Sequence, residues 1–153
     1  MSENLSKVLN EAIDDEYKSR ATYKAVIKKF GEIRPFINIV EAEGRHVNAL
    51  LPLFIKYDIP IPKDNWDGRV NVPDTISEAC HLGVVDEINN AEMYERLLNL
   101  TVQYPDVQEV LKRLQRASKE NHLPAFQRCT EKGMGKGKNR NGLGQRKCKQ
   151  GIR

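Results

Sequence analysis

Apolar side chains recur every three or four residues along four long stretches of this 153-residue chain. Such spacing is typical of amphipathic helices, because it places the apolar side chains on one face. It predicts helices over about residues 5–30, 35–57, 74–102 and 105–132. Pro124 lies inside the last stretch and is expected to bend that helix. Strand-like alternation is absent, so the sequence predicts an all-α fold.

The connections between these helices have very different lengths. Those near residues 31–34 and 103–104 are short, which predicts two antiparallel helical hairpins. The connection over residues 58–73 could span roughly 50 Å when extended, whereas a helix of about 25 residues is only roughly 38 Å long. We therefore expect this connection to cross the length of the bundle, with a simple up-and-down bundle and a loose loop as the alternative.

Each predicted helix carries a carboxylate or an imidazole on the face that should be buried. In chain order these residues are Glu16, Glu43 with His46 on the adjoining ridge, Glu87, and His122. At 1.5 Å per residue they lie about 17 to 28 Å from the turns of their own hairpins, so all five can share one layer near mid-bundle. Buried carboxylates are costly and repel one another, and a dication would remove both problems.

Carboxylate oxygen and imidazole nitrogen are ligands that suit iron, manganese or zinc. The three-residue spacing of Glu43 and His46 puts both on one side of a helix turn. Taken alone, Glu16 would be interpreted as a carboxylate paired with Lys or Arg, and His122 as a hydrogen-bonded histidine. The joint pattern on four helices favours a metal site instead.

Four segments carry a family resemblance: DDEYKSRATY (14–23), FINIVEAEGRHVNALLPLFIKY (36–57), VVDEINNAEMYERLL (84–98) and ASKENHLPAF (117–126). They resemble the ferritin-like superfamily, in particular its rubrerythrin/erythrin branch and a family of small, poorly characterised ferritin-like domains. The resemblance covers roughly residues 3–131. It implies an all-α ferritin-like four-helix bundle, built from two antiparallel hairpins joined by a long crossover.

In that superfamily the first and third helices each provide a Glu, and the second and fourth each provide Glu-x-x-His. The resemblance therefore implies these metal ligands: Glu16, Glu43, His46, Glu87 and His122. The fourth helix departs from the pattern, because Lys119 stands three residues before His122, where a Glu is expected. This leaves open one metal ion, or two ions held asymmetrically with help from Asp15, Asp86, Glu92 or Glu120.

The resemblance also implies a cofactor and an activity. It indicates non-haem iron, as one or two ions, and redox chemistry with O₂ or peroxide of the ferroxidase or peroxidase type, in oxidative-stress defence or iron handling. The chain lacks paired Cys-x-x-Cys motifs, so an electron donor would be a separate molecule; a homodimer is also expected. The alternative is a non-catalytic structural or partner-binding bundle with a degenerate metal site.

Three tyrosines, Tyr17, Tyr23 and Tyr94, lie on or beside the inner faces of the predicted helices. Core packing is their ordinary role. The alternative is that they donate hydrogen bonds or pass electrons at the metal site.

The net charge of +4 is unevenly distributed. Residues 132–153 contain eight Lys or Arg, six Gly and no acidic residue, which leaves 17 basic and 21 acidic residues, a net charge of −4, in residues 1–131. We expect a folded domain over 1–131 and a disordered basic tail over 132–153. The tail could hold nucleic acid non-specifically, although a solubilising role is the more ordinary interpretation.

The three cysteines, Cys80, Cys129 and Cys148, are far apart in the chain. The sequence therefore predicts neither a disulfide framework nor a zinc knuckle, and a reducing cytoplasm is the expected location. No stretch approaches the length of a membrane span, and the acidic N-terminal residues do not resemble a signal peptide.

Overall fold

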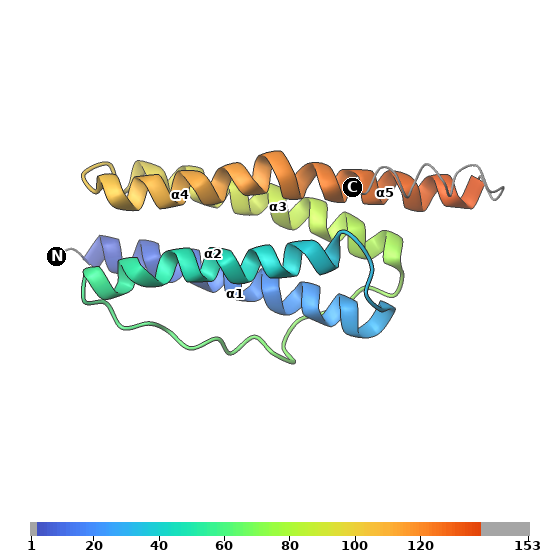
Figure 1. The fold of residues 1–153 in the computed structure, drawn as a ribbon, viewed down its shortest axis with the longest axis horizontal. Helices are drawn as coiled ribbons and strands as arrows, with labels where there is room; N and C mark the ends of the chain where they lie inside the picture. Colours follow the sequence, from blue (N-terminus) through green and yellow to red (C-terminus); the bar gives the residue numbers. More distant parts are fainter. Residues whose placement is uncertain (1–2, 139–153) are drawn as a thin grey trace.

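Four helical rods pack side by side (Figure 1). The structure, a computed structural model, describes residues 3–138, with side chains through residue 132. Helices α1 (Glu3–Phe30) and α2 (Phe36–Lys56) form one antiparallel hairpin. Helix α3 (Ile76–Asn99) forms a second hairpin with a continuous rod, which consists of α4 (Pro105–Ala117), a π-helical segment η1 (Ser118–His122) and α5 (Leu123–Lys138). The described residues contain no strand, so the predicted all-α four-helix bundle is confirmed.

The connection between α2 and α3 runs the length of the bundle alongside α1 (Figure 1). It is anchored rather than loose: the Tyr17 hydroxyl donates to the carbonyl oxygen of Pro62 at 2.9 Å, and the Trp66 indole donates to Asp14 at 2.9 Å. Because the chain returns to the far end before α3 begins, α2 and α3 run in the same direction. The predicted long crossover between two hairpins is thus confirmed.

Local signals set the ends of the helices. The Thr75 hydroxyl accepts a hydrogen bond from the backbone N–H of Glu78, and the Glu78 carboxylate accepts one from the backbone N–H of Thr75. This capping box fixes the start of α3. Gly31 follows α1 with φ at 97°, a left-handed conformation that glycine adopts without strain. Because the start of α3 and the end of α1 are fixed, the heights of Glu87 and Glu16 along the bundle are fixed as well.

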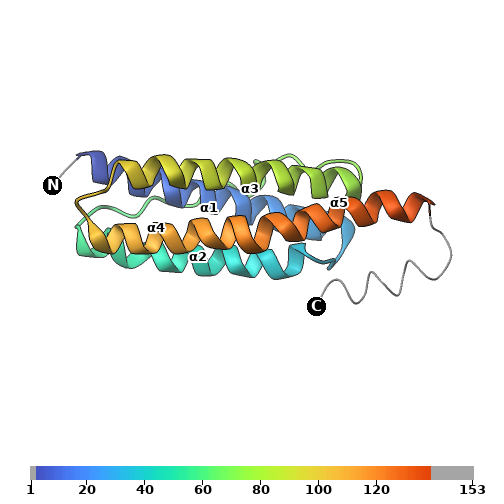
Figure 2. The same ribbon diagram turned by 90° about the horizontal axis from the view of Figure 1, so that it is seen from above.

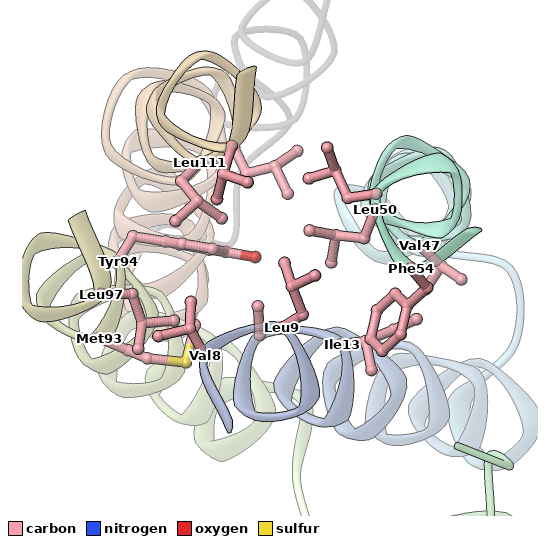
Figure 3. Packing of buried hydrophobic residues seen from close by; sticks show 14 of the residues in the cluster. Val8, Leu9, Ile13, Val47, Leu50, Phe54, Met93, Tyr94, Leu97 and Leu111 are labelled. Carbon is pink, nitrogen blue, oxygen red and sulfur yellow. The ribbon is translucent and has the colours of Figure 1, made fainter. Parts of the chain in front are cut away.

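The buried apolar residues form two clusters. The larger one is shown end-on in Figure 3, where side chains from all four rods, such as Leu9, Leu50, Leu97 and Leu111, point toward the bundle axis. The smaller one contains Tyr23, Val26, Phe36, Ile39, Ala79, Cys80 and Phe126. Along α3 the second cluster ends at Cys80 and the first cluster begins at Met93. The polar layer lies between these positions.

The last rod departs from the sequence prediction at two points. Helix α5 continues to Lys138, past the boundary predicted at residue 131, and residues 139–153 of the predicted tail lie outside the described residues. Pro124, expected to bend the helix, is the second residue of α5 and stands two residues after the π-helical segment ends at His122. Proline has no N–H to donate to the preceding turn, and a π-helical turn is a known way to accommodate such a gap.

Cys80 of α3 and Cys129 of α5 form a disulfide, with their Cα atoms 5.6 Å apart. The prediction, from the wide spacing of the cysteines, that they form no disulfide framework is therefore wrong for this pair. Their separation of 49 residues conceals the contact, which exists only because α3 and α5 pack side by side. Among the described helices, none is both long and apolar enough to cross a membrane.

Candidate metal centre

The structure brings the five predicted ligands together in one buried layer. Glu16, Glu43 and Glu87 are at most 2% exposed, and His46 and His122 are 8% and 5% exposed. They come from α1, α2, α3 and η1. Helix α3 lies beside α1, and α4 lies beside α2 (Figure 2). This arrangement lets side chains from both hairpins meet in one layer.

The five side chains form two groups that share Glu43. The first triad is Glu16, Glu43 and His46, and the second triad is Glu43, Glu87 and His122. Within each triad, one ligand atom from every residue lies within 4.8 Å of the others. Two carboxylates and an imidazole form a donor set suited to first-row transition metals. The buried layer can therefore hold a metal ion.

The first triad is compact. His46 Nδ1 lies 3.2 Å from Glu16 Oε1 and 3.2 Å from Glu43 Oε1. Two ligands at right angles on one ion, each about 2.1 Å from it, are about 3 Å apart. The separations in the first triad are therefore close to those of metal ligands.

The second triad contains a polar atom without a partner. Among the described residues, His122 Nδ1 is buried and makes no hydrogen bond. It faces Glu87 Oε1 at 3.4 Å and Glu43 Oε2 at 3.8 Å. A buried nitrogen left unsatisfied costs about 1–3 kcal/mol. A cation bound by these three side chains would provide the missing partner, so the residues present fit a metal ion.

The two carboxylates that are not shared are held by hydroxyl groups. The Tyr94 hydroxyl donates to Glu16 Oε2 at 2.5 Å, and the Tyr23 hydroxyl donates to Glu87 Oε2 at 3.1 Å. Each tyrosine thus reaches from one hairpin to the carboxylate of the other. Such hydrogen bonds orient ligands and commonly tune metal affinity. Tyr17, by contrast, contacts the crossover and not the site.

Two further polar residues support the layer, and the sequence did not assign them a role. The Asn90 amide donates to Asp15 at 2.7 Å and to Glu16 Oε2 at 3.5 Å. The Ser118 hydroxyl lies 2.7 Å from Glu87 Oε1. Both residues lie on the apolar faces of their helices and are buried, which is the signal that could have identified them.

The pKa values of the buried carboxylates diverge. Burial raises the pKa of Glu43 well above its usual range, and the neighbouring charge of Glu16 adds to this. Burial also acts to raise the pKa of Glu16, but hydrogen bonds with Glu43, His46 and Tyr94 outweigh it and lower the value. Burial and the charge of Glu16 therefore favour the protonated form of Glu43 in the metal-free site. A bound cation would compete with that proton.

The fourth rod does not supply the carboxylate that a Glu-x-x-His motif would provide. Lys119 and Glu120 are exposed, and Ser118 occupies the inward position instead. A π-helical turn is wider than an α-helical turn, so the residue four before His122 faces the site rather than the residue three before it.

None of the four carboxylates considered as substitutes belongs to a triad. Asp15 and Asp86 are half-buried beside the layer, where burial raises the pKa of each to about 6. Glu92 and Glu120 are exposed. The two triads therefore rely on Glu43 alone as their common carboxylate.

No family model matches this chain, and no curated protein matches it. Among solved structures, the crystal structure of a hypothetical protein from Methanococcus jannaschii is similar, with a TM-score of 0.77 and 26% sequence identity. The match covers 86% of this chain and 82% of that chain. It supports the fold and names no activity, so the resemblance to ferritin-like proteins stays a prediction.

Proposed function

We propose that this chain is a ferritin-like protein that binds one iron ion in each triad, with Glu43 as a ligand in both triads. The sharing of Glu43 by both triads is the observation that carries the proposal. The unpartnered His122 Nδ1 supports it independently, because no described side chain satisfies this buried nitrogen. Manganese and zinc suit the same ligands and are competing occupants.

The proposed activity is redox chemistry with peroxide or O₂. When bound, two iron ions would supply one electron each, and reduction of one H₂O₂ to two H₂O consumes two electrons and two protons. The chain itself orients the ligands through Tyr23 and Tyr94. The apolar clusters on either side exclude water from the layer, which strengthens electrostatic interactions within it.

Metal analysis tests the proposal directly. The protein would be purified from iron-supplemented cells, and the iron bound per chain would be counted for the wild type and for Glu43→Ala and His46→Ala. We expect stoichiometric iron in the wild type and a loss in both variants. His81→Ala is the matched control, because His81 is exposed on α3 and its ring bonds the Ser77 carbonyl oxygen. A wild-type protein that binds no metal would refute the proposal.

A non-catalytic bundle is the second candidate. The observation that favours it is Lys119, which is exposed at the position where the superfamily pattern places a ligand. On this hypothesis the metal serves only stability, so loading would raise the melting temperature while the iron-loaded protein consumes neither peroxide nor O₂. Measurements of iron-dependent peroxide and O₂ consumption distinguish the two candidates. Dimer formation and nucleic-acid binding by residues 132–153 stay predictions.

A further inference from the structure

The disulfide and the second triad lie on the same pair of packed helices. Three residue pairs face each other in antiparallel register between α3 and the last rod: Cys80 with Cys129, Gly83 with Phe126, and Glu87 with His122. A Cβ atom at Gly83 would lie only 2.4 Å from the Phe126 ring, so the two helices touch closely at the middle pair. Seven residues along α3 correspond to about 10.5 Å between the cysteine pair and the metal layer.

Aromatic side chains fill the space between the cysteines and the layer. Cys80, Phe126 and Tyr23 belong to one apolar cluster, and Cys129 packs against it. The ring centroids of Phe126 and Tyr23 are 5.2 Å apart, and the Tyr23 hydroxyl donates to Glu87 Oε2. One apolar cluster therefore extends from the cysteine pair to Tyr23, which bonds the Glu87 carboxylate, and its rings Phe126 and Tyr23 are 0% and 1% exposed.

The two cysteines differ in access to solvent. Cys80 is fully buried, whereas Cys129 is half-buried. Buried cysteines in apolar surroundings react slowly with dissolved oxidants. A thiolate from solution can attack a disulfide only at a sulfur that it can reach. Access thus favours reduction of the disulfide at Cys129 and disfavours direct attack of peroxide on Cys80.

We propose that Cys80 and Cys129 are a redox-active pair that supplies electrons to the metal centre. The inference rests on the proposed function, which it deepens by naming the donor. As the S–S bond forms, the two thiols lose two protons and two electrons, and these electrons would return the two iron ions to the ferrous state after each has given one electron to H₂O₂. The net reaction oxidises one dithiol to one disulfide and reduces one H₂O₂ to two H₂O. A thiol reductant from solution then attacks Cys129, regenerates both thiols and is itself oxidised to a disulfide.

The test follows the thiols rather than the peroxide. Full-length protein carrying Cys148→Ser, which removes the third thiol, would be reduced, freed of reductant without oxygen, and loaded with ferrous iron or with Zn²⁺. One equivalent of H₂O₂ is added, and remaining thiols are alkylated at set times and counted by intact mass. Zn²⁺ uses the same ligand types but has no redox chemistry, so we expect both thiols to disappear at least about tenfold faster in the iron-loaded protein. Iron-treated Glu43→Gln should react at the slow rate.

Two results would overturn the inference while leaving the proposed function intact. One is equal thiol oxidation in the iron-loaded and zinc-loaded proteins, which would make the disulfide a structural link. The other is an iron-loaded protein that reduces peroxide with an artificial electron donor while both thiols persist. Failure of the wild type to bind iron would instead overturn the proposed function, and the inference with it.

Discussion

The two hairpins supply the buried polar layer in partly equivalent ways. On α1, Glu16 is followed seven residues later by Tyr23, and on α3, Glu87 is followed seven residues later by Tyr94. Seven residues are about two turns, so each Glu and Tyr share one helix face. Each tyrosine donates to the glutamate of the other helix. The first helices of the hairpins are therefore near-equivalent partners.

The second helices of the hairpins differ. Helix α2 supplies both Glu43 and His46 from a regular α-helix, whereas the last rod supplies only His122 and places the Ser118 hydroxyl where a carboxylate would be expected. The difference teaches that a single carboxylate serves both triads. The two hairpins thus differ in the last rod, where the π-helical turn places Ser118 rather than a carboxylate beside the site.

Removal of the shared carboxylate should have the largest effect. Glu43→Ala takes a ligand from both triads at once, so we expect iron content to fall to background. Glu41→Ala is the control, because Glu41 is exposed on the same helix. Iron per chain, measured after gel filtration, checks the result, and circular dichroism confirms that the helices persist. Retention of one ion by Glu43→Ala would show that Glu43 does not serve both triads.

Removal of either histidine should affect one triad only. His46→Ala and His122→Ala are each expected to lose one of the two ions. The metal-free proteins should differ as well: loss of His46 removes a hydrogen-bonding partner of Glu16, at a cost of about 1–3 kcal/mol, whereas His122 Nδ1 has no hydrogen bond to lose. Metal titration and urea denaturation measure the two effects. Equal destabilisation of both metal-free variants would argue against this difference between the triads.

The sequence contains enough information for the fold and for the clustering of the five ligand candidates. Apolar periodicity and connection lengths set the helices and their order, and Glu16 or His122 on an apolar face is conspicuous because burial of such groups is costly. The ligand role itself stays a prediction, since the structure shows only that these side chains meet.

Other features depend on contacts between helices, which the spacing of apolar residues along the chain does not predict. The pattern around residues 118–122 does not distinguish a π-helical turn from an α-helical one, so the inward position of Ser118 becomes visible only in the fold. Pro124 is a cue to irregularity there, but it indicates neither the kind nor the direction. The Cys80–Cys129 pair likewise depends on the packing of α3 against α5.

Crowding at the two helical glycines offers a further contrast. Gly83→Ala would place a Cβ within 2.4 Å of the Phe126 ring, so α5 must shift away from α3, at a cost of about 1–3 kcal/mol. Gly44→Ala on α2 meets only the Arg20 guanidinium at 3.9 Å and should stabilise the helix by about 0.5–1 kcal/mol. Urea denaturation of the metal-free proteins measures both. If Gly44→Ala destabilised the protein as much as Gly83→Ala, the two glycines would not differ in crowding.

The smallest expected effect concerns Ser118, whose hydroxyl lies 2.7 Å from Glu87 Oε1 and 3.1 Å from the Glu87 carbonyl oxygen. In Ser118→Ala the Glu87 carboxylate keeps its hydrogen bond from Tyr23 but loses the one from Ser118. Its orientation is then less strongly fixed. Loss of a hydrogen bond to a ligand commonly lowers metal affinity by about 10- to 100-fold, and we expect the lower end here because Tyr23 remains. Competition with a chelator of known affinity measures the change for each ion.

Lys119→Ala is the control that makes this prediction specific to the π-helical turn. Residue 119 would face the layer if the rod were a regular Glu-x-x-His helix, but its side chain is exposed. We therefore expect Lys119→Ala to leave the affinity of both ions unchanged, and Ser118→Ala to weaken only the ion held by Glu87. If the order of the two effects were reversed, the rod would present residue 119 to the metal in solution. The difference between the hairpins would then lie in the side chain at residue 119 and not in the helix type.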